Sequence, residues 1–279
     1  MRCTKNGGGT VTVNVGVIGG SGFYAPDVLG DTREFRQDTP FGTVSLTRTQ
    51  LAAGHSFLFV PRHGSEHAVP PHLVNYRAII WAMWQSGVSK LLSTSAVGSL
   101  NPSMKPGDIV LAEQFLDFTK NRPSTFCDGG EFGVIHQDMT SPYCASMRQL
   151  LRRTAQSQAV QLEDGACYAC FEGPRYESAA EIRAIRVLGA DIVGMTNVPE
   201  VVLAREMGLC YSTICVITNW AAGIGRSKLS HDEVVFVVNQ STEKITRLLQ
   251  KTIPMLDAMP DCECGPVRER MGSHVRSLS

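Results

Sequence analysis

Short apolar runs recur along the chain and predict buried strands. Residues 11–18 form a run rich in β-branched side chains that ends in a glycine turn, a pattern typical of a strand in a buried sheet. Two further runs, separated by Ala53 and Gly54, predict a hairpin. The predicted strands are residues 11–18, 44–49, 57–61, 90–96, 108–118, 191–195 and 211–218.

Apolar residues at helical spacing, together with capping residues, predict helices between these strands. Residues 74–86 have this spacing and end before Gly87, which suits a helix C-terminus. Ser178 and Ser230 each have a glutamate three positions later, which is the pattern of a capping box. Pro199 suits a first helical position. The predicted helices are residues 74–86, 147–158, 178–189 and 199–208, and a long final helix that begins at 230.

The predicted strands and helices interleave over one span without a linker-like break. This order favours a single α/β domain with a mainly parallel or mixed central β-sheet flanked by helices. We place this domain at residues 11–256. Residues 257–279 are rich in Pro, Gly, Cys and Arg and are predicted to form a loosely ordered C-terminal tail.

Composition restricts the function classes. The chain has 279 residues, of which 43% are hydrophobic, so it can bury a substantial core. Its 26 basic and 26 acidic residues balance, so no net field attracts nucleic acid or an anionic membrane. The N-terminus is polar, and no stretch is long enough to span a bilayer. These features favour a cytoplasmic protein without nucleic-acid or membrane partners.

Nine cysteines in a chain of this length do not indicate a disulfide scaffold. Cys167 and Cys170 form a C-x-x-C pair, and Cys262 and Cys264 form a C-x-C pair. A zinc site made from both pairs would have to bridge roughly 90 intervening residues. The first pair also lies in a further segment with the character of a strand. Buried free thiols are therefore the better interpretation, and no metal is predicted. Cys262 and Cys264 either form a redox-active pair or have no function, and the sequence does not decide between these alternatives.

Three segments favour a common anion site. Gly19-Gly20-Ser21-Gly22 follows a strand and offers exposed amides and a hydroxyl, which suit phosphate. The segment lacks the G-x-G-x-x-G spacing that is typical of a dinucleotide-binding fold. Arg62 and His63 follow another strand and offer a cation and a donor, although such an arginine also suits a surface salt bridge. Thr196 precedes the helix that Pro199 opens, where free amides carry partial positive charge.

Two other segments have the chemistry to recognise a purine. Tyr176 offers a ring face for stacking, and the neighbouring Glu177 can accept a ring N–H, which a 6-oxopurine has at N1 and a 6-aminopurine lacks. The amide of Asn219 can donate and accept at once, as the O6/N7 edge of the same base requires. Together these residues predict a site for a 6-oxopurine nucleoside.

With these segments in view, the chain resembles the purine nucleoside phosphorylase/methylthioadenosine phosphorylase family from about residue 15 to residue 256. The resemblance implies a trimer-based α/β enzyme that uses inorganic phosphate to displace a purine from C1′ of a nucleoside. The matching stretches occur in one order: Gly19-Gly20-Ser21-Gly22, Asp38-Thr39-Pro40-Phe41-Gly42, Arg62-His63-Gly64, Val74-Asn75-Tyr76-Arg77-Ala78, Pro106-Gly107-Asp108-Ile109, Glu172-Gly173-Pro174-Arg175 and Met195-Thr196-Asn197-Val198-Pro199-Glu200.

Site residues follow from the resemblance, position by position. Phosphate would be held by Ser21, Arg62, His63, Ser95, Ala96 and Thr196. The nucleoside would contact Val97, Gly98, Tyr176, Met195, Asn219, Trp220 and Ala221, with Met195 beneath the ribose. His136 matches a residue that reaches into a neighbouring subunit's site, which implies a homo-oligomer, either a trimer or a dimer of trimers. Phosphate is a co-substrate, and the resemblance implies no cofactor.

The overall spacing follows the methylthioadenosine branch, but three positions depart from it. Asn219-Trp220-Ala221 stands where that branch has Asp-aromatic-Asp, and Glu177 replaces a small polar residue. His231 stands near a position where that branch packs a methylthio group on an apolar side chain. All three resemble the 6-oxopurine nucleoside phosphorylases, in which the histidine bonds the 5′-hydroxyl. Asn219, Glu177 and His231 are thus the predicted catalytic residues.

Each of these positions also has an ordinary structural interpretation. Glu177 could favour a helix N-terminus, His231 could be a solvated first-turn residue, and Asn219 could form a turn. Because all three residues occur together at the positions that distinguish the branches, they favour a phosphorylase of inosine and guanosine that acts in purine salvage. A phosphorylase of methylthioinosine or methylthioadenosine is the alternative within the family, and a non-catalytic nucleoside-binding module is the alternative outside it.

Overall fold

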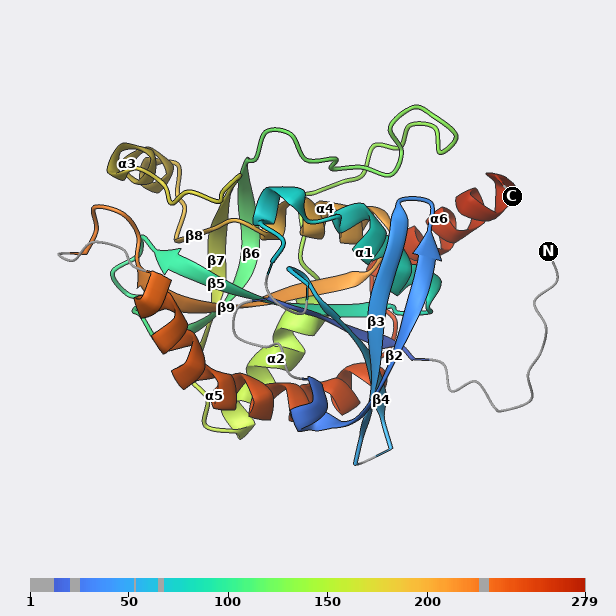
Figure 1. The fold of residues 1–279 in the computed structure, drawn as a ribbon, viewed down its shortest axis with the longest axis horizontal. Coiled ribbons are helices and arrows are strands. Elements are labelled where there is room, and N and C mark those ends of the chain that lie inside the picture. The colour runs from blue at the N-terminus through green and yellow to red at the C-terminus, as the bar shows by residue number, and fades with distance from the viewer. Residues whose placement is uncertain (1–12, 21–25, 53, 65–67, 226–230, 279) are drawn as a thin grey trace.

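The computed structural model describes residues 13–20, 26–52, 54–64, 68–225 and 231–278. Nine strands form one mixed sheet in the order β2-β3-β4-β1-β5-β8-β7-β6-β9, and β9 also pairs with β5 (Figure 1). The last five strands in this order therefore close into a ring. The strands are β1 Val15–Gly19, β2 Gly30–Thr39, β3 Gly42–Leu51, β4 Ser56–Pro61, β5 Lys90–Ser99, β6 Ile109–Phe118, β7 Leu162–Phe171, β8 Ile192–Gly194 and β9 Cys210–Trp220.

Helices cover both faces of this sheet. α2 and α5 lie against one face, and α1, α4 and α6 lie on the other (Figure 1). The helices are α1 Tyr76–Gln85, α2 Ala145–Ser157, α3 Ala179–Val187, α4 Asn197–Glu206, α5 His231–Asp257 and α6 Cys264–Leu278, with short 3₁₀ turns η1 Pro26–Leu29 and η2 Pro71–Leu73. Among the described residues, no helix is both long and apolar enough to cross a membrane.

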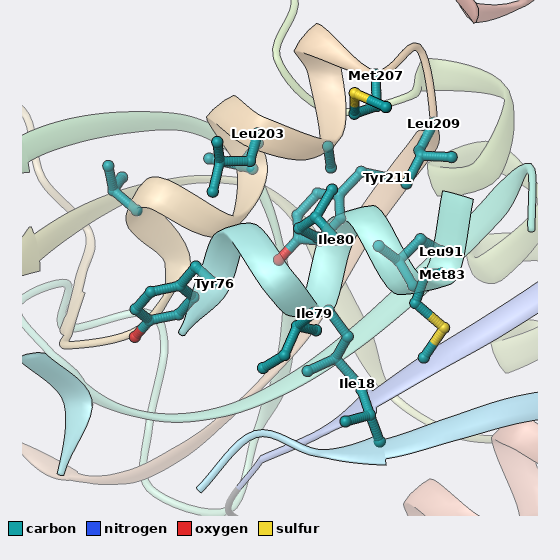
Figure 2. Close-up of a cluster of buried hydrophobic side chains, with 14 of the residues drawn as sticks. Ile18, Tyr76, Ile79, Ile80, Met83, Leu91, Leu203, Met207, Leu209 and Tyr211 are labelled. Atoms are coloured by element: carbon teal, nitrogen blue, oxygen red, sulfur yellow. The ribbon is translucent and has the colours of Figure 1, made fainter. Parts of the chain in front are cut away.

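α1 shows how the sequence builds the helical layer that supports one end of the sheet. The side chain of Asn75 accepts from the backbone N–H of Ala78 and caps the helix N-terminus. Gly87 follows the helix with a φ of 92°, a value that favours glycine. Between these ends, apolar side chains of α1 point toward α4 and toward the strands. Figure 2 shows this cluster: Ile18, Tyr76, Ile79, Ile80, Met83, Leu91, Leu203, Met207, Leu209 and Tyr211.

Parallel pairing sets the position of the functional site. β1 runs parallel to β4 and β5, and β5 runs parallel to β9. Their carboxyl ends therefore meet along one edge, and in open α/β sheets ligands bind outside the carboxyl ends of parallel strands. The predicted single α/β domain with a mixed sheet is confirmed.

Two parts of the fold differ from the sequence-based expectation. β2 was not predicted, because Gly30–Thr39 is mostly polar and exposed. It is the free edge strand, where charged side chains discourage pairing with other chains. The predicted loosely ordered tail from residue 257 is wrong for its larger part, since Cys264–Leu278 forms α6. Met271 of α6 is buried, and the backbone of Arg268 lies so close to Gly208 that a Cβ there would be 2.1 Å from its nitrogen.

Candidate functional site

A cavity of about 480 Å³ opens at the carboxyl ends of β4, β5 and β9 and beside β8. Its size suits a small heterocyclic ligand rather than a macromolecule. The lining comes from segments far apart in the sequence: Arg62, His63, Ala68, Val69, Pro70, Pro71, Ser95, Ala96, Val97, Gly98, Pro174, Tyr176, Glu177, Val193, Gly194, Met195, Thr196, Thr218, Asn219 and Ala221.

A bulge in the sheet directs Asn219 into this cavity. Along the β5–β9 pair, Val97 lies opposite Ile217 but Gly98 lies opposite Asn219, so Thr218 is an extra residue in β9. The Thr218 hydroxyl oxygen lies 3.2 Å from the Val97 carbonyl oxygen. An extra residue bends a strand and re-aims the side chains that follow it. A Cβ at Gly98 would lie 3.2 Å from Asn219 Nδ2, so glycine leaves room for the amide.

Arg62 lines the cavity, but Glu200 compensates its charge. Arg62 Nε donates to Glu200 Oε2 at 2.7 Å, and Nη2 donates to Glu200 Oε1 at 3.0 Å. The side chains are only 1% and 0% exposed. Burial lowers the pKa of the guanidinium, but the Glu200 carboxylate outweighs burial and raises the pKa overall. Arg62 is therefore a permanent cation in a bidentate pair of nearly zero net charge.

Most of the guanidinium is occupied by this pairing and by neighbouring acceptors. Nη1 donates to the Thr94 carbonyl at 2.9 Å, and Nη2 also donates to Ser93 Oγ. Among the described residues, one N–H on Nη1 remains without an acceptor. A Cβ at Gly20 would lie 2.1 Å from Nη1, so the glycine turn after β1 packs directly on this group. Arg62 can therefore offer an anion one N–H rather than a whole guanidinium face.

Hydroxyl and imidazole groups also line the cavity. Ser95 Oγ lies 3.3 Å from Thr196 Oγ1 and 3.3 Å from the Tyr168 hydroxyl. Thr196 is the N-cap of α4, but its side chain makes no capping bond, so the hydroxyl faces the cavity instead of the helix. His63 Nδ1 lies 2.8 Å from the Val69 carbonyl, which fixes the ring. These groups lie beside the start of α4, where Val198 is non-helical (φ −106°, ψ 130°), so their own hydroxyl and imidazole groups are the donors available to an anion.

Glu177 also lines the cavity, and it is the carboxyl group there whose pKa is most perturbed. Its residue is 7% exposed, and its Oε1 is buried with no hydrogen-bond partner among the described residues. Burial raises the pKa of Glu177 from its ordinary value of 4.5 to about 7. A buried acceptor without a partner is costly unless a ligand supplies the donor. Glu177 is therefore poised to accept an N–H from a bound molecule.

Asn219 retains hydrogen-bonding capacity in the cavity. Its Oδ1 accepts from the Thr218 hydroxyl at 2.7 Å, and its Nδ2 donates to the Trp220 carbonyl at 2.9 Å. Because an amide has two N–H groups and two lone pairs on its oxygen, one donor and one acceptor remain. Asn219 is 7% exposed, so these groups would meet a ligand out of contact with bulk water.

Tyr176 and Met195 supply apolar surface to the cavity lining. Tyr176 is 40% exposed and lines the cavity beside Glu177. Met195 lies against Gly173, where a Cβ would approach its sulfur to 2.7 Å. Gly173 has a φ of 64°, which also favours glycine. The turn that carries Tyr176 therefore packs closely on Met195.

Comparison with known proteins decides the family. The sequence profile of the phosphorylase superfamily matches residues 14–254. The chain belongs to the phosphorylase superfamily.

The relatives are similar over almost their whole length. A probable 6-oxopurine nucleoside phosphorylase of Moorella thermoacetica is 49% identical, over 90% of this chain and 96% of that protein. A probable S-methyl-5′-thioinosine phosphorylase of Methanopyrus kandleri is 45% identical, over 91% and 97%. The crystal structure of methylthioadenosine phosphorylase from Schistosoma mansoni with adenine superposes with a TM-score of 0.86 at 30% identity, over 95% and 98%. The resemblance stated from the sequence is confirmed.

This phosphorylase-superfamily chain brings most of the predicted site residues together. Twelve of them line the cavity: Arg62, His63, Ser95, Ala96, Val97, Gly98, Tyr176, Glu177, Met195, Thr196, Asn219 and Ala221.

Four predicted residues are not placed in the cavity. Trp220 is half-buried outside the lining, although its carbonyl orients Asn219. His136 is exposed, and the cavity of its own chain does not include it. Ser21 lies outside the described residues. His231 begins α5, but its side chain is not among those described. The roles of all these residues stay predictions.

Arg122 is a structural residue of this site that the sequence did not reveal. It comes from the long segment after β6, and its side chain is 1% exposed. Nη1 donates to the carbonyls of Met195 and Val198 at 2.7 and 2.8 Å, and Nη2 donates to the carbonyl of Glu172 at 2.5 Å. Arg122 thus joins the two segments that carry Thr196 and Glu177. A lone arginine in a loop has no sequence pattern that would identify this role.

Proposed function

We propose that this chain is a purine nucleoside phosphorylase that converts inosine and guanosine, with phosphate, into the free base and ribose 1-phosphate. One observation carries the proposal: a buried glutamate with no partner among the described residues and an asparagine line the same cavity as Arg62, Ser95 and Thr196, which can donate to an anion. A 6-oxopurine has the N1–H and the O6/N7 edge that these two side chains would recognise. The Moorella thermoacetica relative supports this choice of substrate.

Phosphate binding would depend on neutral donors as much as on charge. The hydroxyls of Ser95 and Thr196 and one N–H of Arg62 would hold the dianion. Because Glu200 offsets Arg62, the site would not bind phosphate so tightly that its nucleophilic oxygens are held back from the sugar. This balance suits a co-substrate that must react rather than only bind.

The reaction breaks the C1′–N9 bond and forms a C1′–O bond to phosphate. As the bond breaks, the sugar becomes cationic and the purine takes the electron pair. Phosphate stabilises the sugar, while Asn219 would donate to O6 and accept from N7–H as the departing base gains a proton. Ionised Glu177 would accept from N1–H. Contacts that strengthen as charge develops are those that lower the barrier.

A release assay tests the reaction class. Hypoxanthine and ribose 1-phosphate formed from inosine are measured with and without inorganic phosphate. We expect both products in equal amounts, and only with phosphate. Base release without phosphate would indicate a hydrolase, and tight inosine binding without release would indicate a non-catalytic binding module; either result contradicts the proposal.

A methylthioinosine phosphorylase is the second candidate, favoured by the 45% identical relative of Methanopyrus kandleri. The two candidates differ at the 5′ position of the sugar, where His231 at the start of α5 is predicted to bond a hydroxyl. A site built for a hydroxyl strongly rejects an analogue that lacks it. His231→Val should therefore lower inosine turnover and relatively favour methylthioinosine. If the unmodified enzyme already prefers methylthioinosine, the second candidate is correct.

We also propose that the active unit is a cytoplasmic homo-oligomer, a trimer or a dimer of trimers. His136 supports this proposal, because the family resemblance assigns it to a neighbouring subunit's site and it is exposed and remote from its own cavity lining. Purine salvage is the corresponding metabolic role. No further cofactor is proposed for the reaction, since phosphate itself is the nucleophile.

A further inference from the structure

Four cysteine sulfurs meet at a point outside the nucleoside cavity. Cys144, Cys210, Cys262 and Cys264 have their Sγ atoms within 4.8 Å of one another. Cys262 Sγ lies 3.6 Å from Cys144 Sγ and 3.3 Å from Cys210 Sγ. Three of the residues are buried, and Cys262 is half-buried. None of them lines the cavity, and the proposed phosphorolysis gives them no role.

We propose that these four cysteines form a structural zinc site. Zinc in structural sites is tetrahedral, with Zn–S bonds of about 2.3 Å, which separates the sulfurs by about 3.8 Å. The observed separations of 3.3 and 3.6 Å, within a cluster no wider than 4.8 Å, need only small side-chain movements to reach this geometry. Four thiolates without an open position are typical of structural rather than catalytic zinc.

The backbone around the cluster favours deprotonated sulfur. Cys144 is the N-cap of the 13-residue helix α2, and Cys264 is the first residue of the 15-residue helix α6. Both sulfurs therefore lie at the positive ends of helices, where thiolates are stabilised. Arg205 Nη1 also donates to Cys264 Sγ at 3.3 Å. These groups would offset part of the negative charge of a zinc tetrathiolate.

Binding of Zn²⁺ would release the proton of every sulfur that is still protonated, with no exchange of electrons. Disulfide formation, by contrast, requires an oxidant.

The membership of the cluster corrects the sequence-based treatment of the cysteines. The sequence pairs Cys262 and Cys264 with Cys167 and Cys170, and this pairing gave no reason to expect a metal. In the structure, Cys170 instead accepts from the backbone N–H of Val198 at 3.3 Å. The partners of the C-terminal pair are single cysteines at the start of α2 and of β9, which no local spacing connects.

Such a site would fix α6 to the rest of the domain. Cys262 lies between α5 and α6, whereas Cys144 and Cys210 belong to the packed interior. One zinc ion would therefore join four segments of the chain at the hydrophobic core between the sheet and helices α2 and α5. Metal binding to the native state alone stabilises that state. The inference is independent of the proposed reaction and would stand if the substrate assignment failed.

Metal analysis of the whole chain tests the proposal. The protein is purified without chelator under reducing conditions, and bound zinc is measured by mass spectrometry. We expect about one zinc per chain, and we expect removal of zinc by a chelator to lower Tm by about 5 °C or more. Cobalt(II) added to the metal-free, reduced protein should give the strong visible absorption of tetrahedral cobalt thiolate.

Matched variants locate the metal. Cys262→Ser with Cys264→Ser should lose the zinc, while Cys167→Ser, outside the cluster, should retain it. If the double variant does not fold, the cobalt titration of the unmodified chain still decides the question. The proposal is wrong if reduced, zinc-treated protein retains no metal after excess zinc is removed, if the purified chain holds iron instead, or if intact-mass measurement finds the four cysteines joined as disulfides.

Discussion

At the scale of single residues, the site depends on groups whose bonding is incomplete without a ligand. Glu177 has a buried oxygen with no partner in the described structure, and Asn219 keeps one donor and one acceptor. The cost of an unsatisfied buried group is about 1–3 kcal/mol. A ligand that satisfies both side chains recovers that cost, which is how a small cavity can select one purine edge over another.

Glu177→Gln should lower kcat/KM for inosine by about 10- to 100-fold, since a hydrogen bond to a charged group contributes about 1.5–3 kcal/mol. The unmodified enzyme needs ionised Glu177, so its kcat/KM should rise as the pH increases through about 7. The variant should lose this rise. Glu163→Gln, exposed on β7, is the matched control. An unchanged pH profile in Glu177→Gln would exclude Glu177 from base recognition.

Glu177→Gln should also change how the stability of the protein depends on pH. The folded-state pKa of Glu177 is raised to about 7 from 4.5, so the folded state binds more protons than the unfolded state between these values. Its contribution to the free energy of unfolding therefore falls as the pH rises across this window. Relative to the unmodified protein, Glu177→Gln should gain Tm as the pH rises from 4.5 to 7 and then stay constant. A pH-independent Tm difference would contradict the raised pKa.

Asn219→Asp should exchange one base preference for another. The substitution removes the donor that would bond O6 and introduces a carboxylate that accepts from a 6-amino group. Turnover of inosine and guanosine should fall by about 10- to 100-fold, corresponding to about 1–3 kcal/mol, and some activity on adenosine should appear. Asn239→Asp, exposed on α5, controls for added charge. Unchanged inosine turnover would mean that Asn219 does not contact the base.

At the scale of elements, irregular features place the site residues. The β5–β9 bulge aims Asn219, the uncapped Thr196 starts α4, and Arg122 joins the segments around Met195 and Glu172. Regular strands and helices were predicted well because hydrophobic period and capping residues specify them locally. The bulge, the edge strand β2 and the role of Arg122 depend on pairing between distant segments, which no local pattern records.

Arg122→Lys should raise KM for phosphate and for inosine together. Lysine keeps the charge but cannot bond several carbonyls at once, so the segments that carry Thr196 and Glu177 should both shift. A misplacement of about 1 Å can reduce rates about 100-fold. Steady-state kinetics with each substrate varied separately check this prediction. Arg153→Lys, at an exposed position of α2, is the control. A loss of Tm without any change in either KM would limit Arg122 to a purely structural role.

At the scale of the whole molecule, the predicted α/β architecture and most of the predicted cavity lining agree with the structure. The resemblance predicted twelve of the residues that line the cavity, because their motifs are contiguous in sequence. It could not indicate that Glu200 neutralises Arg62, because a strand-end arginine and a helical glutamate 138 positions apart share no motif. The four-cysteine cluster was missed for the same reason, since its members meet only after the sheet closes.

Subunit exchange tests whether the assembled oligomer is the active unit. His136→Ala and Glu177→Gln should each lower inosine turnover, the first because a neighbour's site loses its histidine. Oligomers co-assembled from both variants should regain activity, since some sites then combine an intact Glu177 with an intact His136. Mixed and separately purified samples are compared at equal total protein. No recovery in the mixed sample would place His136 outside the neighbouring site.

Phosphorolysis of inosine, guanosine, adenosine and methylthioadenosine, measured side by side, tests the central claim most directly. The account assigns Glu177 and Asn219 to N1–H and O6, groups that only the first two nucleosides have. Because a site that bonds a substrate group rejects analogues without it by about 10⁴-fold or more, kcat/KM should be high for inosine and guanosine and very low for the other two. Comparable or higher kcat/KM for adenosine or methylthioadenosine would contradict the account.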